Sequence, residues 1–134
     1  MEINKHTIHD ANLPQSADEF SEEFAGCKVA SLIDFLSGYD QVKLDIKNRD
    51  ITAFQTPLGL LRQTTLLQGA TNSVAQFVQI MMKILEDLIP KDCWPFMDDV
   101  GVKGPYSMYR DEEVCPGVCR YVMEHIQSLD RTLE

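Results

Sequence analysis

Residues 94–102, Trp94-Pro95-Phe96-Met97-Asp98-Asp99-Val100-Gly101-Val102, contain two short apolar pieces separated by a pair of aspartates. Apolar pieces on both sides of a polar dipeptide are typical of a strand–turn–strand hairpin. The sequence therefore predicts a hairpin over 94–102 that carries the carboxylates of Asp98 and Asp99 at its tip.

A second apolar run lies upstream, in Val29-Ala30-Ser31-Leu32-Ile33-Asp34, and it also ends on a carboxylate. We expect a buried strand here, with Asp34 at its C-terminal end. If this strand is a neighbour of the 94–102 hairpin in one sheet, Asp34, Asp98 and Asp99 converge near one edge. Charge at the end of a buried run is costly without a partner, so the pattern favours a binding partner for these carboxylates.

Capping signals and apolar spacing predict two helices in the first two-thirds of the chain. Ser16-Ala17-Asp18-Glu19 has the pattern of a capping box and begins a helix over 16–25. Apolar residues at intervals of three and four predict a longer helix over 71–88, with Thr71 or Asn72 as its N-cap.

A last helix is predicted over 116–133, beginning near Pro116. The segments 51–56 and 60–64 flank Pro57-Leu58-Gly59 and predict a further hairpin. Together these elements predict an α+β fold in which a small antiparallel sheet is packed with about three helices.

The composition limits the class of protein. The chain has 134 residues, of which 44% are hydrophobic, which suits one small domain with its own core. No apolar run approaches the roughly 18 residues of a membrane span, so we expect no membrane partner. The N-terminus lacks a secretory layout and the four cysteines lack the spacing of a disulfide framework. We therefore expect an intracellular protein with reduced thiols.

The charge balance is acidic, with 12 Lys and Arg against 21 Asp and Glu and a formal net charge of -9. Contact with phosphates relies on clustered Lys and Arg. This balance argues against a free-standing nucleic-acid binder, although sequence outside the chain can supply a basic groove.

The paired aspartates allow two interpretations. Carboxylate oxygens are hard ligands that suit Mg²⁺, and two such ions about 3.5–4 Å apart assist both the attacking and the leaving oxygen in phosphoryl transfer. An Asp-Asp pair is also common in tight turns, because aspartate tolerates turn geometry. The pattern by itself leaves both a metal-dependent transferase and a plain turn open.

Four segments, in order along the chain, resemble the motifs of retroelement reverse transcriptases. They are Ser31-Leu32-Ile33-Asp34-Phe35-Leu36-Ser37-Gly38-Tyr39-Asp40-Gln41, Thr52-Ala53-Phe54-Gln55-Thr56-Pro57-Leu58-Gly59, Leu67-Gln68-Gly69-Ala70-Thr71-Asn72-Ser73-Val74-Ala75-Gln76-Phe77 and Phe96-Met97-Asp98-Asp99. Upstream, Asn4-Lys5-His6-Thr7-Ile8 with Leu13-Pro14 resembles the lead-in of Ty3/gypsy-type elements. The resemblance runs from Asn4 to Val102.

The resemblance implies a polymerase palm that adds nucleotides to a DNA 3′-hydroxyl on a template, with two Mg²⁺ ions or with Mn²⁺. Asp34, Asp98 and Asp99 are then the catalytic residues that hold the metal ions. It also implies nucleotide-binding roles for three further residues: Tyr39 lies under the incoming sugar and disfavours a 2′-hydroxyl, while Gln68 and Gly69 lie against the incoming nucleotide and the template.

The resemblance also implies partners beyond this chain. They are the RNA/DNA template-primer, the dNTP and the remaining polyprotein domains, namely the fingers, the thumb and RNase H. The compartment it implies is a cytoplasmic particle or the nucleus.

Two departures from the family pattern lead us to expect a polyprotein fragment. Met1 stands where the family has an Arg that holds the triphosphate, and the chain ends at Glu134, before the thumb and RNase H. We expect residues 1–15 to be an extended arm left from the lead-in to the fingers and residues 16–134 to be a partial palm, inactive in isolation. The alternative is a non-catalytic retroelement remnant, or a recruited protein-interaction module, that keeps the palm fold.

Overall fold

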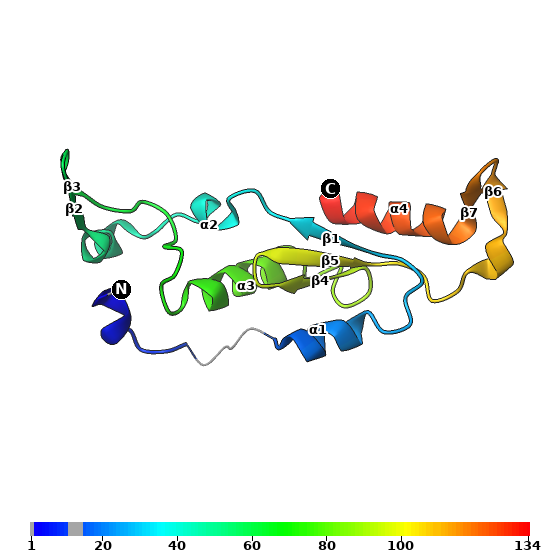
Figure 1. Cartoon of the computed structure of the whole chain (residues 1–134), viewed down its shortest axis with the longest axis horizontal. Coiled ribbons are helices and arrows are strands. Elements are labelled where there is room, and N and C mark those ends of the chain that lie inside the picture. The colour runs from blue at the N-terminus through cyan, green and yellow to red at the C-terminus, as the bar shows by residue number, and fades with distance from the viewer. Residues whose placement is uncertain (1, 11–14) are drawn as a thin grey trace.

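The computed structural model of the chain describes residues 2–10 and 15–134. The molecule is long in one direction, with a three-stranded antiparallel sheet in the middle and a two-stranded hairpin towards each end (Figure 1). The helices are η1 (Glu2–Lys5), α1 (Ala17–Glu23), α2 (Gly38–Gln41), η2 (Ile46–Asn48), η3 (Asp50–Thr52), α3 (Ser73–Ile84), η4 (Tyr109–Asp111) and α4 (Arg120–Leu133). The strands are β1 (Ala30–Asp34), β2 (Phe54–Thr56), β3 (Gly59–Leu61), β4 (Cys93–Phe96), β5 (Asp99–Lys103), β6 (Glu113–Cys115) and β7 (Val118–Cys119).

The central sheet has the order β1-β5-β4, so the strand that ends at Asp34 and the 94–102 hairpin are neighbours, as the sequence predicts. Both pairings are antiparallel. Residues opposite each other in such a pair share a face of the sheet, and successive residues alternate between faces. Ile33 is opposite Val100, so these two side chains share the face that we call the core face.

The core face carries the most deeply buried side chains of the molecule. Val102 and Cys93 are 0% exposed and Val100 is 1% exposed. They pack against Phe77 and Met81 of α3, and the removal of each such side chain from water stabilises the fold by about 1.5–3 kcal/mol. The core thus holds the two strands that carry the candidate carboxylates in one rigid unit.

The opposite face of the sheet is partly covered by α1. The rings of Phe20 and Phe24 contact each other at a centroid distance of 4.8 Å, and they lie over Gly101, where an added Cβ would stand 2.3 Å from Phe24 Cζ. Glycine here is therefore required for the close approach of α1 to β5. Lys103, also on this face, is buried and donates to Glu23 Oε2 of α1 at 2.7 Å.

The predicted burial of the first strand is wrong. β1 alternates between exposed and half-buried residues, and Leu32 is 60% exposed. The reason is its position: β1 is an edge strand that pairs with β5 alone in the described sheet, while Phe20 and Phe24 lie over β5 and Phe20 packs against Phe96 of β4. Only Ile33 and its face pack against the core.

The predicted start of the last helix is also wrong. Pro116 and Gly117 form the turn of the β6–β7 hairpin, in which Cys115 pairs with Val118, and α4 begins at Arg120. Gly117 has a φ of 79°, a conformation that suits a hairpin turn and ends a helix. Towards the other end of the molecule, the hairpin expected over 51–64 is confirmed as β2 and β3, three residues each.

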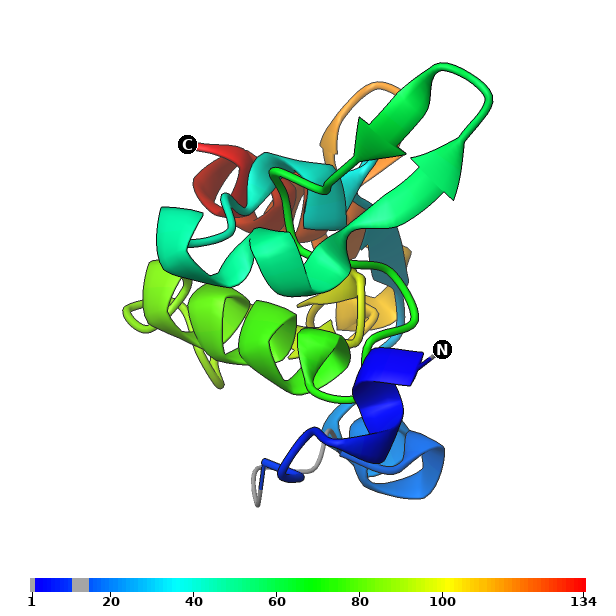
Figure 2. The same ribbon diagram turned by 90° about the vertical axis from the view of Figure 1, so that its left-hand side faces the viewer.

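The N-terminal arm is not extended throughout, because Glu2–Lys5 forms the 3₁₀ helix η1. Figure 2 shows η1 beside the N-terminal end of α3, to which the arm is tied by side-chain hydrogen bonds. Met1 and Leu13-Pro14, which the sequence analysis singled out, lie outside the described residues. The division into an arm over 1–15 and a palm over 16–134 stays a prediction. Among the described residues no helix is long and apolar enough to cross a membrane.

Candidate active site

The candidate carboxylates lie at one end of the central sheet. The register places Asp34, the last residue of β1, directly opposite Asp99, the first residue of β5. Opposed residues in an antiparallel pair have Cα atoms about 4.5–5.5 Å apart and side chains on the same face. Asp98 lies in the turn, immediately before Asp99. Three carboxylates from two distant parts of the chain therefore come to the same end of the sheet.

The tip of the hairpin is displaced by one residue from the prediction. Phe96 pairs with Asp99, which leaves Met97 and Asp98 as the two turn residues and makes Asp99 a strand residue. Met97 has a φ of 54°, in the left-handed region that a tight two-residue hairpin requires. Asp98 and Asp99 are therefore not equivalent: one projects from the turn and the other is fixed by strand pairing on both sides.

The electrostatics of the cluster are repulsive. Burial, followed by the charges of Asp98 and Asp34, raises the pKa of Asp99 above its usual range. Within the described residues, no group of three or more His, Cys, Asp or Glu side chains is already arranged to hold a metal ion. The donor set is nevertheless that of a hard divalent cation, because carboxylate oxygens are its preferred ligands and a bound cation would cancel the repulsion.

Tyr39 lies beside this cluster. It belongs to α2, and its ring packs against Phe77 of α3 at a centroid distance of 4.9 Å. Gly38 permits this contact, because a Cβ there would stand 2.8 Å from Phe77 Cζ. Burial and then the charge of Asp98 raise the pKa of Tyr39, so the phenol lies within electrostatic range of the carboxylates.

Gln68 and Gly69 form an exposed loop before α3. Gly69 has a φ of 84°, and a Cβ added to it would meet no atom within 4 Å. The outer side of this loop is thus open to a ligand. Its carbonyl side is not open, because Asn4 Nδ2 donates to Gly69 O at 3.1 Å.

Sequence reasoning missed the residues that hold this loop. The sequence predicts Thr71 or Asn72 as the N-cap of a helix over 71–88. The structure places Asn72 at the N-cap of α3 without a capping hydrogen bond from its side chain, and the helix ends earlier than predicted, at Ile84. The Asn72 side chain bonds instead to Ile8 and Asp10 of the arm. Asn4 and Asn72 both belong to segments that resemble family motifs. Nothing in the sequence of either segment, however, indicates that the two segments bind each other.

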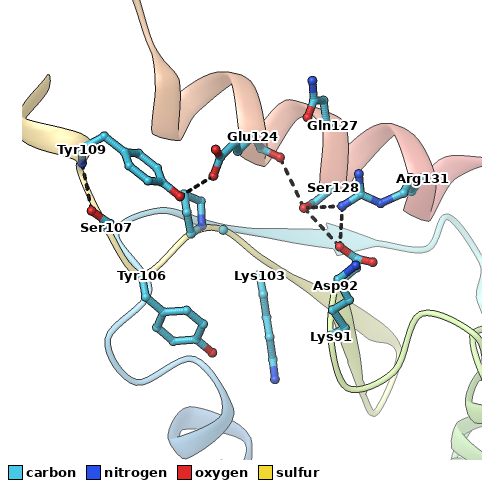
Figure 3. Close-up of a pocket in the computed structure, with 12 residues that line it drawn as sticks. Lys91, Asp92, Lys103, Tyr106, Ser107, Tyr109, Glu124, Gln127, Ser128 and Arg131 are labelled. Carbon is cyan, nitrogen blue, oxygen red and sulfur yellow. Dashed lines mark hydrogen bonds and ion pairs between the residues drawn. The ribbon is translucent and has the colours of Figure 1, made fainter. Parts of the chain in front are cut away.

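A cavity of about 560 Å³ lies at the far end of β5, between the loop after Lys103 and α4. Several of its polar side chains bind one another: Tyr109 donates to Glu124, and Arg131 donates to Asp92 and Ser128 (Figure 3). These bonds tie α4 to the segments around the cavity, which lies at the opposite end of β5 from Asp99.

Comparison with known proteins decides the family. A family model described as "Reverse transcriptase (RNA-dependent DNA polymerase)" matches residues 2–128. The chain belongs to the reverse transcriptase family. Enzymes of this family use divalent metal ions, in agreement with the donor set at the end of the sheet.

Relatives of this reverse transcriptase domain are polyproteins. It is 31% identical over 103 residues to the retrovirus-related Pol polyprotein from transposon 412 of Drosophila melanogaster, covering 77% of this chain and 8% of the relative. It is 32% identical over 98 residues to the enzymatic polyprotein of cauliflower mosaic virus (strain D/H), covering 73% of this chain and 14% of the relative. The chain thus spans a small part of the length of these relatives.

Solved structures support the fold of the domain. A foamy virus protease-reverse transcriptase matches 98% of this chain with a TM-score of 0.73 at 22% identity, over 15% of its own length. A foamy viral protease-reverse transcriptase in complex with an RNA/DNA hybrid matches 81% with a TM-score of 0.69 at 23% identity, over 14% of its own length. The α+β prediction, a small antiparallel sheet with packed helices as in a polymerase palm, is confirmed.

Proposed function

We propose that this chain is the palm segment of an RNA-directed DNA polymerase from a Ty3/gypsy-type LTR retroelement, and that Asp34, Asp98 and Asp99 are its catalytic, metal-holding residues. The observation that supports this is the register of β1 on β5, in which Asp34 is opposite Asp99 and Asp98 occupies the adjoining turn. Charged side chains this close repel one another, and a divalent cation offsets that repulsion.

In this proposal Mg²⁺ or Mn²⁺, as a pair of ions, would supply activation of the 3′-hydroxyl and stabilisation of the pyrophosphate that leaves the dNTP. The chain's own residues bind the ions and orient the nucleotide. Asp34 and Asp99 at the end of the sheet, together with Asp98 in the turn, would hold the ions. The ring of Tyr39, fixed against Phe77, blocks the space that a 2′-hydroxyl needs. The Gln68–Gly69 loop lies against the nucleotide.

The proposal extends to partners outside this chain. These are an RNA/DNA template-primer, a dNTP and the fingers, thumb and RNase H of a longer polyprotein inside the cell. With a net charge of -9, the palm segment itself repels nucleic acid, so basic residues elsewhere must hold the template. The same charge favours a second candidate, a non-catalytic remnant or interaction module that retains the fold.

Binding of Mg²⁺ separates the two candidates. At ten times its dissociation constant Mg²⁺ stabilises a protein by about 1.4 kcal/mol, so we expect the melting temperature of the chain to rise with added Mg²⁺. The rise should be lost in Asp98→Asn and Asp99→Asn. Asp111→Asn is the matched control, because Asp111 is an exposed aspartate of η4, near the other end of the molecule.

The catalytic claim needs a second measurement. In a polypeptide that joins residues 2–128 to the remaining domains of a reverse transcriptase, we expect Asp98→Asn to lower primer extension on an RNA template by roughly a hundredfold or more. Asp111→Asn should leave it unchanged. Equal extension by Asp98→Asn and the parent protein would remove Asp98 from the mechanism and favour the non-catalytic candidate.

A further inference from the structure

The N-terminal arm and the loop before α3 are joined by two asparagine side chains. Asn4 of the arm bonds to the loop, and Asn72 at the start of α3 bonds to the arm. From the arm, Asn4 Nδ2 donates to Gly69 O at 3.1 Å and Asn4 Oδ1 accepts from Thr71 N at 3.0 Å. From the start of α3, Asn72 Nδ2 donates to Ile8 O at 2.8 Å and Asn72 Oδ1 accepts from Asp10 N at 3.0 Å. We call these four hydrogen bonds the asparagine clamp.

Each half of the clamp binds the backbone in the same way. A side-chain amide offers donors and an acceptor at once, and here it bonds the carbonyl of one residue and the amide two residues later, at 69 and 71 or at 8 and 10. The asparagine amide therefore satisfies both backbone groups with a single side chain. An aspartate would keep the acceptor and lose the donor.

The clamp bonds to the inner side of the loop, on which the Gly69 carbonyl lies. Gly69 lies at a φ of 84° with no atom within 4 Å of the position of a Cβ, so the outer side of the loop is open. On the inner side, Ala70 N donates to Leu67 O at 3.1 Å and Ser73 Oγ donates to Leu67 O at 2.6 Å. The loop is therefore a tight turn that is held on its inner side and open on its outer side.

The Asn72 side chain bonds to the arm and does not cap α3. An N-cap asparagine ordinarily accepts from an amide of the first helical turn, yet the Asn72 side chain makes no such bond in α3. Gln79 of α3 reinforces the same junction, since its Nε2 donates to Asp10 Oδ2 at 3.3 Å. Two side chains, Asn72 at the N-cap and Gln79 within α3, thus bond to the arm.

We propose that Asn4 and Asn72 are positioning residues that hold the Gln68–Gly69 loop in the conformation that receives an incoming nucleoside triphosphate. This inference rests on the proposed function for its ligand, and on the clamp for its geometry. The arm then acts as a brace that keeps the binding loop preorganised, a condition on which affinity and reaction geometry depend.

The clamp itself is tested by amide hydrogen exchange on the 134-residue chain. A hydrogen bond contributes about 1 kcal/mol, which corresponds to roughly a fivefold change in an opening equilibrium. We expect Asn4→Ala to speed exchange of the Thr71 amide by at least that factor, and Asn72→Ala to do the same for Asp10. Asn4→Asp, which retains the acceptor, should leave Thr71 closer to the parent value than Asn4→Ala does.

Thr7→Val is the matched control. Thr7 lies in the same arm, but its hydroxyl donates to Ile3 O within the arm, so the variant perturbs the arm without touching the clamp. Exchange at Thr71 should be unchanged in Thr7→Val. Unchanged exchange at Thr71 in Asn4→Ala would overturn the clamp, whatever the chain binds.

The nucleotide role is tested separately with thymidine 5′-triphosphate and Mg²⁺, followed by the amide signal of Gly69. We expect saturable shifts in the parent chain and roughly tenfold weaker binding in Asn4→Ala. Ser128→Ala is the control: it removes hydrogen bonds at α4, on the other side of the molecule from the loop, and should leave binding unchanged. A parent chain in which Gly69 does not respond would overturn the nucleotide role of the loop, and so the proposed function of Gln68 and Gly69, while the exchange result still decides the clamp.

Discussion

At the scale of single residues, the behaviour of Asp99 follows from its two acidic neighbours. Strand pairing with Asp34 and sequence proximity to Asp98 place three carboxylates together, and burial and these charges raise the pKa of Asp99. An ionised carboxylate in such a place destabilises the folded chain, a cost in stability that the proposed divalent cation would reduce.

Asp99→Asn tests this cost. The pKa of Asp99 is higher in the folded state than the ordinary value near 3.9. The Asp99 carboxyl therefore keeps its proton to a higher pH in the folded chain than in the unfolded chain, and the free energy of unfolding falls as the pH rises between these two pKa values. We expect Asp99→Asn to melt about 2 °C higher than the parent at pH 7, a small gain because solvent screens the cluster. The gap should close below about pH 4. Melting curves measured without divalent ions from pH 3 to 7 check this, and a gap that persists at pH 3 would contradict it.

Ser31 has a buried partner that the sequence did not indicate. Its hydroxyl lies 2.7 Å from His125 Nε2 of α4, and His125 is 5% exposed. Ser31→Ala leaves that ring nitrogen buried without a partner, which costs about 1–3 kcal/mol. Urea unfolding measures the loss. Ser21→Ala, which removes a hydroxyl on the surface of α1 that donates to Ala17 O, should cost markedly less.

At the scale of elements, the packing of α1 on the sheet depends on one glycine. A side chain at Gly101 would collide with Phe24 and Phe20, the latter 2.9 Å from an added Cβ. We expect Gly101→Val to push α1 away from β5 and to cost about 1–3 kcal/mol as an overpacked core does. Fluorescence of Trp94, the single tryptophan, monitors urea unfolding close to the change.

A second substitution shows whether the collision is the cause. Gly101→Val combined with Phe24→Ala removes the ring that the valine meets, so the double variant should be less destabilised than the sum of the two single changes. Strict additivity would mean that Gly101→Val acts through the backbone of β5 and not through α1.

Elements differ in how well local sequence predicts them. The capping box is confirmed, since Ser16 Oγ accepts from Glu19 N and Glu19 bonds back to Ser16 N. Pro116-Gly117 was misread as a helix start because proline suits the first helical turn and a hairpin turn alike. The Glu113–Cys119 pairing that decides between them gives no distinct signal in so short a stretch.

At the scale of the whole molecule, the β2–β3 hairpin projects from one end (Figure 1), and several of its apolar residues are exposed. Leu58 is 92% exposed and Leu60 is 70% exposed. Exposed apolar side chains promote association, so we expect the purified chain to self-associate as its concentration rises. The double variant Leu58→Ser with Leu60→Ser should reduce this, as measured by sedimentation velocity.

The control for that experiment is a pair of exposed apolar residues elsewhere, Ile126→Ser with Leu133→Ser on α4, which are 50% and 71% exposed. If both pairs lower association equally, general hydrophobicity and not the hairpin is responsible. If neither does, the association prediction is wrong.

The sequence by itself determined the features that depend on neighbours a few residues apart: the cap at Ser16, the existence of hairpins around 57–59 and within 94–102, and the order of motifs that marks a reverse transcriptase domain. Only the tertiary structure decided that Asp34 is opposite Asp99, that β1 is an exposed edge, and that Asn4 and Asn72 bind across more than 60 residues of chain. Turns and caps are set by local dihedral preferences, whereas strand register and side-chain clamps depend on which distant segments pack together, and that is set by the burial of the whole core.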